Sequence, residues 1–229
     1  MSKQRAVEQH GRPPAAEAAL EHRSVIAALA AAGIAGLVIF AGVALVQSLL
    51  RPEHSFVADP ISALAVGPSG WVQDVNFLVF GALMIAYAIG LHLGVRPTRW
   101  GVVGLAFLVL SGAGLVWAGL FPSTDATGAR WDDRVLHIVA FPMTFLGGGL
   151  GLIVMSRRMA GDPRWRRVAT YALATGIAVL LLLLAGAGLV RPSGAPLHPS
   201  WGLFQWALLA VWFPCTVVLA LRLLRVARA

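Results

Sequence analysis

The chain has 229 residues, of which 58% are hydrophobic and only 12% charged, and its 18 Lys and Arg outnumber its 10 Asp and Glu. Soluble domains carry about 25% charged residues, and disordered proteins combine high charge with low hydrophobicity, so this composition excludes both classes. A polytopic membrane protein remains, in which the positive charge marks topology and contact with membrane lipids rather than nucleic acid binding.

Six stretches without Asp, Glu, Lys or Arg are long enough to cross a bilayer, which takes about 20 apolar residues in a helix. In chain order they are 24–50, 75–95, 100–121, 135–156, 168–190 and 200–221. None alternates polar and apolar residues as a membrane β-strand does. We predict an all-α fold, a bundle of six transmembrane helices over residues 24–224, between a polar N-terminal tail (1–23) and a short C-terminal tail (225–229).

Basic residues are distributed unevenly over the two sides of this bundle. Fourteen Lys and Arg fall in the N-terminal tail, after the second and fourth helices and at the C-terminal end, whereas only Arg51, Arg130, Arg134 and Arg191 fall on the opposite side. The positive-inside rule then places both termini in the cytoplasm. We expect a multipass protein of the cell membrane whose basic inner side, including the segment 157–167, faces lipid.

Acidic residues and several histidines show the opposite bias. Six of the ten acids lie in or beside the three outer segments, together with three histidines. These residues are Glu53, His54, Asp59, Asp74, Asp125, Asp132, Asp133, His137 and His198. Side chains capable of acid–base chemistry or ligand binding are therefore expected at the outer end of the bundle.

The candidate catalytic residues are His137, Asp125, Asp133 and Ser62. Asp133 precedes His137 by four residues and shares its helix face, so its carboxylate can orient the imidazole. In this hypothesis His137 acts as a base or a ligand, Asp125 or Asp133 orients it, and Ser62 donates a hydrogen bond. Structural roles stay open, because an Asp at a helix start commonly caps the helix and a His one turn in can bond a neighbouring loop.

Further candidate ligand-binding residues lie at the start of the second helix and in the outer loops. They are Trp71, Asp74, Asn76, Asp59, His54 and His198. Gln73 and Asn76 are three residues apart, so we expect them to share a helix face while Asp74 points elsewhere. The alternatives are an aromatic-belt role for Trp71 and Trp201, and solvation for His54 and His198.

Known cofactor motifs are missing from the sequence. There is no Walker A, GxGxxG or HExxH pattern, and no two histidines are four residues apart, so we assign no metal and leave the cofactor unknown. A zinc site from His54, His137 and His198 would need the outer loops to fold over the bundle. A Ser–His–Asp arrangement from Ser62 or Ser123, His137 and Asp125 or Asp133 is also conceivable, but the sequence has no nucleophile elbow.

Glycines recur inside the third, fourth and fifth helices. Gly147 and Gly151 form a pair four residues apart in the fourth helix. Such small residues let helices approach closely, so we expect tight helix packing here. The alternative is that the glycines leave room for an apolar ligand.

Several short motifs in the outer segments resemble a known family. They are the run Asp59–Leu64, then Gly67, Gly70–Trp71, Asn76, Phe121–Pro122 with Asp125, and His137. In this order and spacing they resemble the multipass bacterial and archaeal family catalogued as domain of unknown function 998, over roughly residues 25–224. The resemblance implies a six-helix membrane bundle without an established activity, and it points to Ser62, Asp125 and His137.

Three functions are compatible with these features. The first is an outer site for a lipid-like or amphiphilic ligand, in a binding protein or a membrane enzyme. The second is a structural or accessory subunit that packs against a membrane protein partner, or forms a homo-oligomer, through glycine-rich faces. The third is a small transporter, which the scarcity of polar residues at the helix centres disfavours.

Overall fold

The computed structural model describes residues 14–98, 100–121, 131–190 and 196–228. Over these ranges every regular element is helical, and six of the helices are long and apolar enough to cross a membrane. The elements are α1 (Pro14–Leu50), η1 (Ile61–Ala65), α2 (Trp71–Gly94), α3 (Gly101–Leu120), α4 (Trp131–Ala160), α5 (Arg166–Leu189), η2 (His198–Ser200) and α6 (Trp201–Arg228). The predicted all-α, six-helix fold is confirmed.

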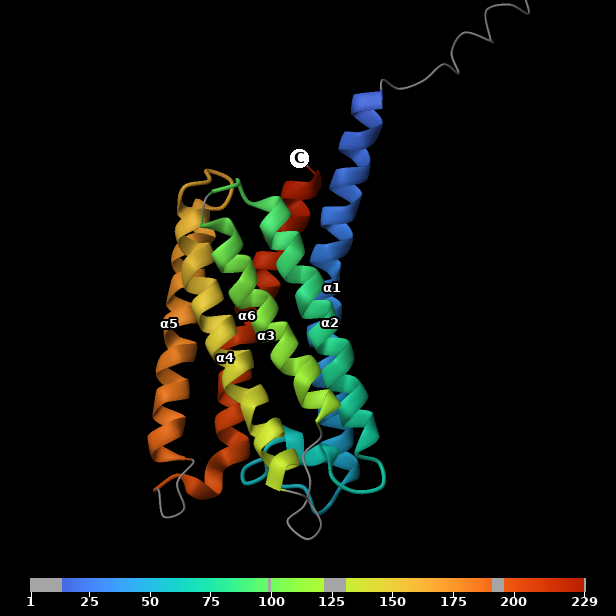
Figure 1. The fold of residues 1–229 in the computed structure, drawn as a ribbon, viewed down its shortest axis with the longest axis vertical. Coiled ribbons are helices and arrows are strands. Elements are labelled where there is room, and N and C mark those ends of the chain that lie inside the picture. The colour runs from blue at the N-terminus through green and yellow to red at the C-terminus, as the bar shows by residue number, and fades with distance from the viewer. Residues whose placement is uncertain (1–13, 99, 122–130, 191–195, 229) are drawn as a thin grey trace, which may run out of the picture.

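The six long helices run side by side along the long axis of the molecule, each antiparallel to the next in the chain (Figure 1). The start of α1 and the end of α6 lie at the same end, which we call the terminal end. The opposite end, with the segment 51–70, is the distal end. α6 contacts both α1 and α5, so the last helix joins the first to the fifth.

α1 begins at Pro14, ahead of the apolar stretch that starts at residue 24. Ala and Glu dominate the intervening segment, and both are strong helix formers, so the helix continues beyond the bundle. In Figure 1 this first part of α1 projects past the other helices.

Glycines bring neighbouring helices into backbone contact. A Cβ atom on Gly81 of α2 would lie 2.6 Å from the carbonyl oxygen of Gly112 in α3. One on Gly147 of α4 would lie 2.7 Å from the backbone nitrogen of Ser111 in α3, and one on Gly176 of α5 would lie 2.7 Å from a carbonyl oxygen of α4. The space beside these three glycines is therefore filled by backbone, as close packing predicts, and leaves no room for a ligand.

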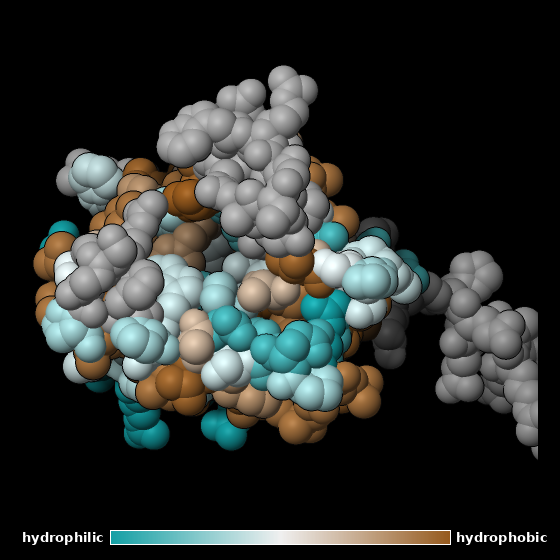
Figure 2. All heavy atoms as spheres, turned by 90° about the horizontal axis from the view of Figure 1, so that it is seen from below, coloured by the Kyte–Doolittle hydropathy of each residue, from teal (hydrophilic) through white to brown (hydrophobic). Residues whose placement is uncertain are grey.

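The distal end is a mosaic of hydrophilic and hydrophobic surface, seen end-on in Figure 2. Its main described component is the segment between α1 and α2, which contains η1. Arg51 fastens this segment, because its guanidinium donates to the carbonyl of Val66 (2.8 Å) and to the hydroxyl of Ser69 (2.7 Å). These bonds hold the segment against the end of α1, so η1 lies over the helix bundle.

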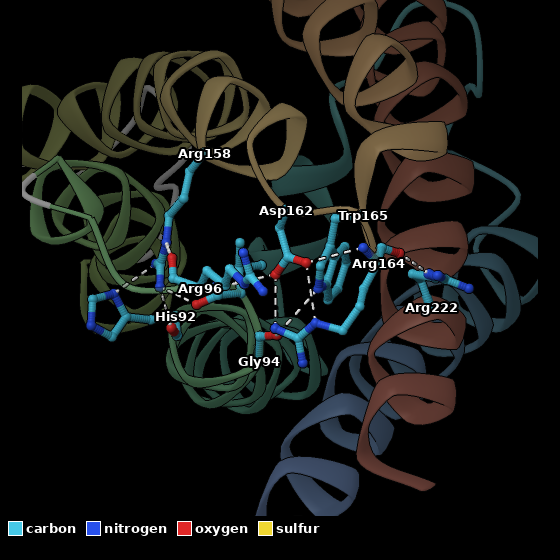
Figure 3. A network of polar contacts seen from close by, with 9 residues as sticks. His92, Gly94, Arg96, Arg158, Asp162, Arg164, Trp165 and Arg222 are labelled. Atoms are coloured by element: carbon cyan, nitrogen blue, oxygen red, sulfur yellow. Dashed lines mark hydrogen bonds and ion pairs between the residues drawn. The ribbon is translucent and has the colours of Figure 1, made fainter. Parts of the chain in front are cut away.

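At the terminal end, a buried arginine caps α2 (Figure 3). The guanidinium of Arg158 in α4 donates from Nη2 to the carbonyls of His92 (2.8 Å) and Val95, and from Nε to the carbonyl of Arg96 (2.6 Å). The last carbonyls of a helix have no partner within the helix, and an apolar environment offers no water to replace one. Arg158 thus satisfies the carboxyl end of α2.

Asp162 is the acidic centre of the same network. Its carboxylate accepts hydrogen bonds from the backbone nitrogen of Arg96 (3.1 Å) and from the backbone and guanidinium of Arg164 (3.0 and 2.7 Å). Burial alone would raise the pKa of Asp162, but these donors lower it to about 2. Trp165 adds a bond from Nε1 to the carbonyl of Gly94 (3.1 Å), so α2 is tied to the α4–α5 turn.

This network corrects one expectation. The basic segment 157–167 was expected to face lipid, but Arg158 is only 6% exposed and its guanidinium is bonded to α2. Arg164 is half exposed and pairs with Asp162. Arg158 differs from the other arginines because it lies against free carbonyls at the end of α2 and near the carboxylate of Asp162. Hydrogen bonds from a charged guanidinium to these carbonyls make a buried position favourable.

Candidate functional site

A cavity of about 350 Å³ occupies the distal half of the bundle. Every long helix and η1 contribute to its wall, and most lining residues are apolar. The aromatic members are Phe40, Phe77, Phe80, Phe141, Phe145, Trp201 and Trp212, and the polar members are Ser62, His137, Thr144 and Gln205. Among the lining residues that the structure describes, none is Asp, Glu, Lys or Arg.

Contacts between aromatic rings build the walls of the cavity. Phe40 of α1 stacks on Phe80 of α2 with ring centroids 4.5 Å apart. On the other side, Phe141 of α4 contacts Trp201 of α6 at 5.5 Å. Such pairs prefer defined geometries and restrict side-chain movement. Trp201, which the sequence suggested as a membrane-surface anchor, therefore faces the cavity.

His137 lies in the second turn of α4 and reaches back to the end of α3. Its Nδ1 is 2.7 Å from the carbonyl oxygen of Phe121. A carbonyl can only accept, so Nδ1 carries the proton and Nε2 bears a lone pair when the ring is neutral. A second bond joins the same helices, from Nε1 of Trp117 to the carbonyl of Leu136 (2.8 Å). The histidine is thus held by α3 and presents its ring to the cavity.

Ser62 lines the cavity from η1, and a residue of α6 fixes its position. The backbone nitrogen of Ile61 donates to Oε1 of Gln205 (2.8 Å). Ile61 is the first residue of η1 and follows the N-cap Pro60, so its backbone N–H has no partner within the short helix. The bond to Gln205 satisfies this donor. Ser62 and His137, two of the predicted catalytic residues, consequently line one cavity.

The other members of the predicted catalytic set fall outside the described residues. Asp125 belongs to the segment 122–130, which lies beyond them. Asp133 is in the first turn of α4, four residues before His137, but its side chain is not among those described. The same applies to the side chain of His198 in η2.

The predicted residues at the start of α2 lie behind the cavity wall or away from it. Gln73 and Asn76 are buried, and Nδ2 of Asn76 donates to Oε1 of Gln73 (3.2 Å) and to the carbonyl of Phe40 (3.1 Å). The expected shared face is confirmed, and the bond to α1 supports a ring that lines the cavity. Asp74 is half buried and does not line the cavity, and Trp71 is 65% exposed.

Asp59 and His54 shape the segment 51–70 rather than line the cavity. Oδ2 of Asp59 accepts from the backbone nitrogen of Ser55 (2.8 Å), which closes a turn. His54 packs edge-on against Phe56 with centroids 6.1 Å apart. Burial lowers the pKa of His54, against an opposing effect of the nearby Asp59 carboxylate.

Comparison with known families identifies the chain. The profile of the family described as "Protein of unknown function (DUF998)" matches residues 34–222. The chain belongs to the DUF998 family. This match confirms the family resemblance, and it spans the cavity from Phe40 to Trp212. No curated protein and no solved structure matches the chain. The DUF998 protein is therefore an integral multipass membrane protein.

Sequence reasoning missed two polar residues of the DUF998 cavity, Thr144 and Gln205. Gln205 is the only amide side chain in the stretch 200–221, which has no charged residue, and polar side chains at such positions need partners across helices. That rule could have flagged Gln205. The aromatic residues of the wall gave no such signal, because Phe and Trp are common in any membrane helix and only packing shows which of them meet.

Proposed function

We propose that this DUF998 protein binds a lipid-like, amphiphilic ligand in the distal cavity. The observation that carries the proposal is the aromatic cavity of about 350 Å³ with a few polar groups in its wall. Small-molecule sites typically have about 300–1,000 Å³, mostly apolar walls and a few polar groups that orient the ligand.

The wall changes in character with depth. Ser62 and His137 come from the distal ends of their elements, whereas Phe145 and Trp212 lie further into the bundle. His137 and Phe145 are separated by eight residues of α4, which corresponds to about 12 Å along a helix axis. A ligand with a polar head near Ser62 and His137 and an apolar body among the deeper rings matches this arrangement.

The charge distribution supports an extracytoplasmic site. The terminal end carries most of the arginines, and the positive-inside rule assigns such an end to the cytoplasm of a cell membrane. Both termini are then cytoplasmic, and the distal cavity is reached from the outer leaflet. Nε2 of His137 bears a lone pair in the neutral ring, so in a membrane enzyme this nitrogen would be the base that accepts a proton from the bound ligand.

Photolabelling in lipid nanodiscs tests the proposal. The probe is a single-chain lipid with a diazirine in its tail, and the modified residues are mapped by peptide mass spectrometry. We expect saturable labelling of α4 between His137 and Phe145 and of α6 between Trp201 and Trp212. Labelling confined to lipid-facing residues, without saturation, would contradict the proposal.

A matched pair of variants on α5 sharpens this test. Ala187→Phe places a ring on an exposed residue that lines the cavity, whereas Leu184→Phe places the same ring on a residue that is 72% exposed and does not line it. We expect Ala187→Phe to abolish cavity labelling and Leu184→Phe to leave it unchanged. Equal labelling of both variants would argue against binding in the cavity.

A further inference from the structure

The polar inventory of the cavity restricts the charge of its ligand. Four described lining residues are polar, namely Ser62, His137, Thr144 and Gln205. None of them carries a charge when the imidazole of His137 is neutral. Burying a phosphate, a carboxylate or an ammonium group is costly unless an opposite charge or several strong hydrogen bonds compensate it. The described wall supplies no Arg or Lys for an anion and no Asp or Glu for a cation. It therefore favours a neutral head group.

His137 supplies a hydrogen-bond acceptor. Its Nδ1 is committed as a donor to the carbonyl of Phe121 at 2.7 Å. No carboxylate lines the described wall, so the neutral ring is the form that needs no buried counter-ion. In that form Nε2 has a lone pair and no hydrogen. A ligand group that bonds to it must carry a proton.

Gln205 and Ser62 supply donors. The backbone nitrogen of Ile61 can only donate, so the Gln205 atom at 2.8 Å from it is the amide oxygen. This assignment leaves the amide NH₂ of Gln205 as a donor. The hydroxyl of Ser62 can donate as well as accept. The cavity thus combines an acceptor with donors, which is the complement of a hydroxyl group and not of an ether or a ketone.

We propose that the ligand of this cavity is a neutral amphiphile with a hydroxyl head group, whose proton is accepted by Nε2 of His137 and whose oxygen accepts from Ser62 or Gln205. This inference rests on the proposed function and specifies its ligand class. Long-chain and polycyclic alcohols belong to this class, whereas fatty acids, phosphorylated lipids and quaternary ammonium lipids do not.

Four probes with one diazirine-bearing tail test the ligand class. Their heads are an alcohol, the methyl ether of that alcohol, a carboxylate and a trimethylammonium group, and each is titrated against the full chain in phosphatidylcholine nanodiscs. We expect half-saturation by the alcohol at roughly 3- to 10-fold lower concentration than by the ether, because the alcohol makes one more net hydrogen bond. The two charged probes should bind more weakly than the ether.

Two variants assign the bonds. His137→Phe should remove the preference for the alcohol over the ether while the ether still labels the cavity. Ser62→Ala should weaken the alcohol and the ether by a similar factor where the serine hydroxyl is the donor, and should leave both unchanged where the Gln205 amide is the donor. If His137→Phe does not fold, the comparison of the four probes on the unaltered protein still tests whether the ligand carries a hydroxyl head group.

The outcomes separate the two proposals. Absence of saturable cavity labelling by all four probes overturns ligand binding in the cavity. Saturable labelling in which the ether, the carboxylate or the ammonium probe equals or exceeds the alcohol overturns the hydroxyl assignment but leaves cavity binding intact. If the alcohol labels the cavity at lower concentration than the other three probes, and His137→Phe removes this preference, the result supports both cavity binding and the hydroxyl head group.

Discussion

The guanidinium of Arg158 in α4 donates from Nη2 to the carbonyl of His92 in α2 at 2.8 Å, which joins two helices that are not consecutive in the chain. Two further carbonyls at the end of α2 accept from the same side chain. One arginine therefore terminates a transmembrane helix and ties it to another.

Replacement of this arginine should be strongly destabilising. Arg158→Met leaves three carbonyls without a donor in a buried position, and we expect a loss of about 2–4 kcal/mol in the free energy of unfolding. The neighbouring Arg157 is exposed, so Arg157→Met should change the stability by less than about 0.5 kcal/mol. Thermal unfolding of both variants in detergent measures the difference, and equal midpoints would contradict the capping role.

Asp162 should make the stability depend on acid pH. Its pKa in the folded protein is about 2, below the ordinary value of 3.8, so its contribution is fully present above about pH 4 and is lost as the pH falls toward 2. Since its partner Arg164 is half exposed, we expect a contribution of about 1–2 kcal/mol. Unfolding midpoints of the native chain and Asp162→Asn should converge as the pH falls through this window; a constant gap would refute the assignment.

His54 should make the stability depend on pH in a higher range. Burial lowers its pKa in the folded protein below the ordinary value of 6.5. Its contribution is therefore fully present above about pH 6.5 and decreases as the pH falls below this value, because the unfolded chain binds the proton more readily. We expect His54→Phe, which keeps a ring against Phe56, to lose less stability than the native chain between pH 7 and pH 5. Parallel pH profiles would exclude this role of His54.

Glycine positions should differ sharply in their tolerance of a methyl group. A Cβ on Gly81 would lie 2.6 Å from the Gly112 carbonyl oxygen and force α2 and α3 apart, so we expect Gly81→Ala to cost about 1–3 kcal/mol. Gly188 has no atom within 4 Å of its Cβ position, so Gly188→Ala should be neutral or stabilising by up to about 1 kcal/mol. Unfolding midpoints of the two variants in one detergent test this contrast.

The fold was predictable because a membrane imposes a simple requirement. Each spanning helix needs a charge-free stretch of sufficient length, and all six stretches appear in the sequence before any packing is known. The shared face of Gln73 and Asn76 was predictable for a similar reason, since their spacing on a helix determines it.

Parts of the site and of the terminal end depended on contacts between distant segments. A charge count treats all arginines of the segment 157–167 alike, and only the proximity of the α2 carbonyls distinguishes Arg158 from Arg157. Likewise, Ser62 and Gln205 are far apart in sequence, and both reach the cavity because the Gln205 side chain holds η1. The roles predicted for Asp125, Asp133 and His198 stay predictions.

The two bonds between α3 and α4 have a consequence for evolution and for engineering. Because the Phe121 carbonyl and Trp117 hold His137 and Leu136 directly, the imidazole is positioned by the helices and not by the linker that connects them. Insertions, deletions or an epitope tag in residues 122–130 should therefore leave the histidine in register. Homologues can therefore vary the length of that linker without displacing the imidazole of His137.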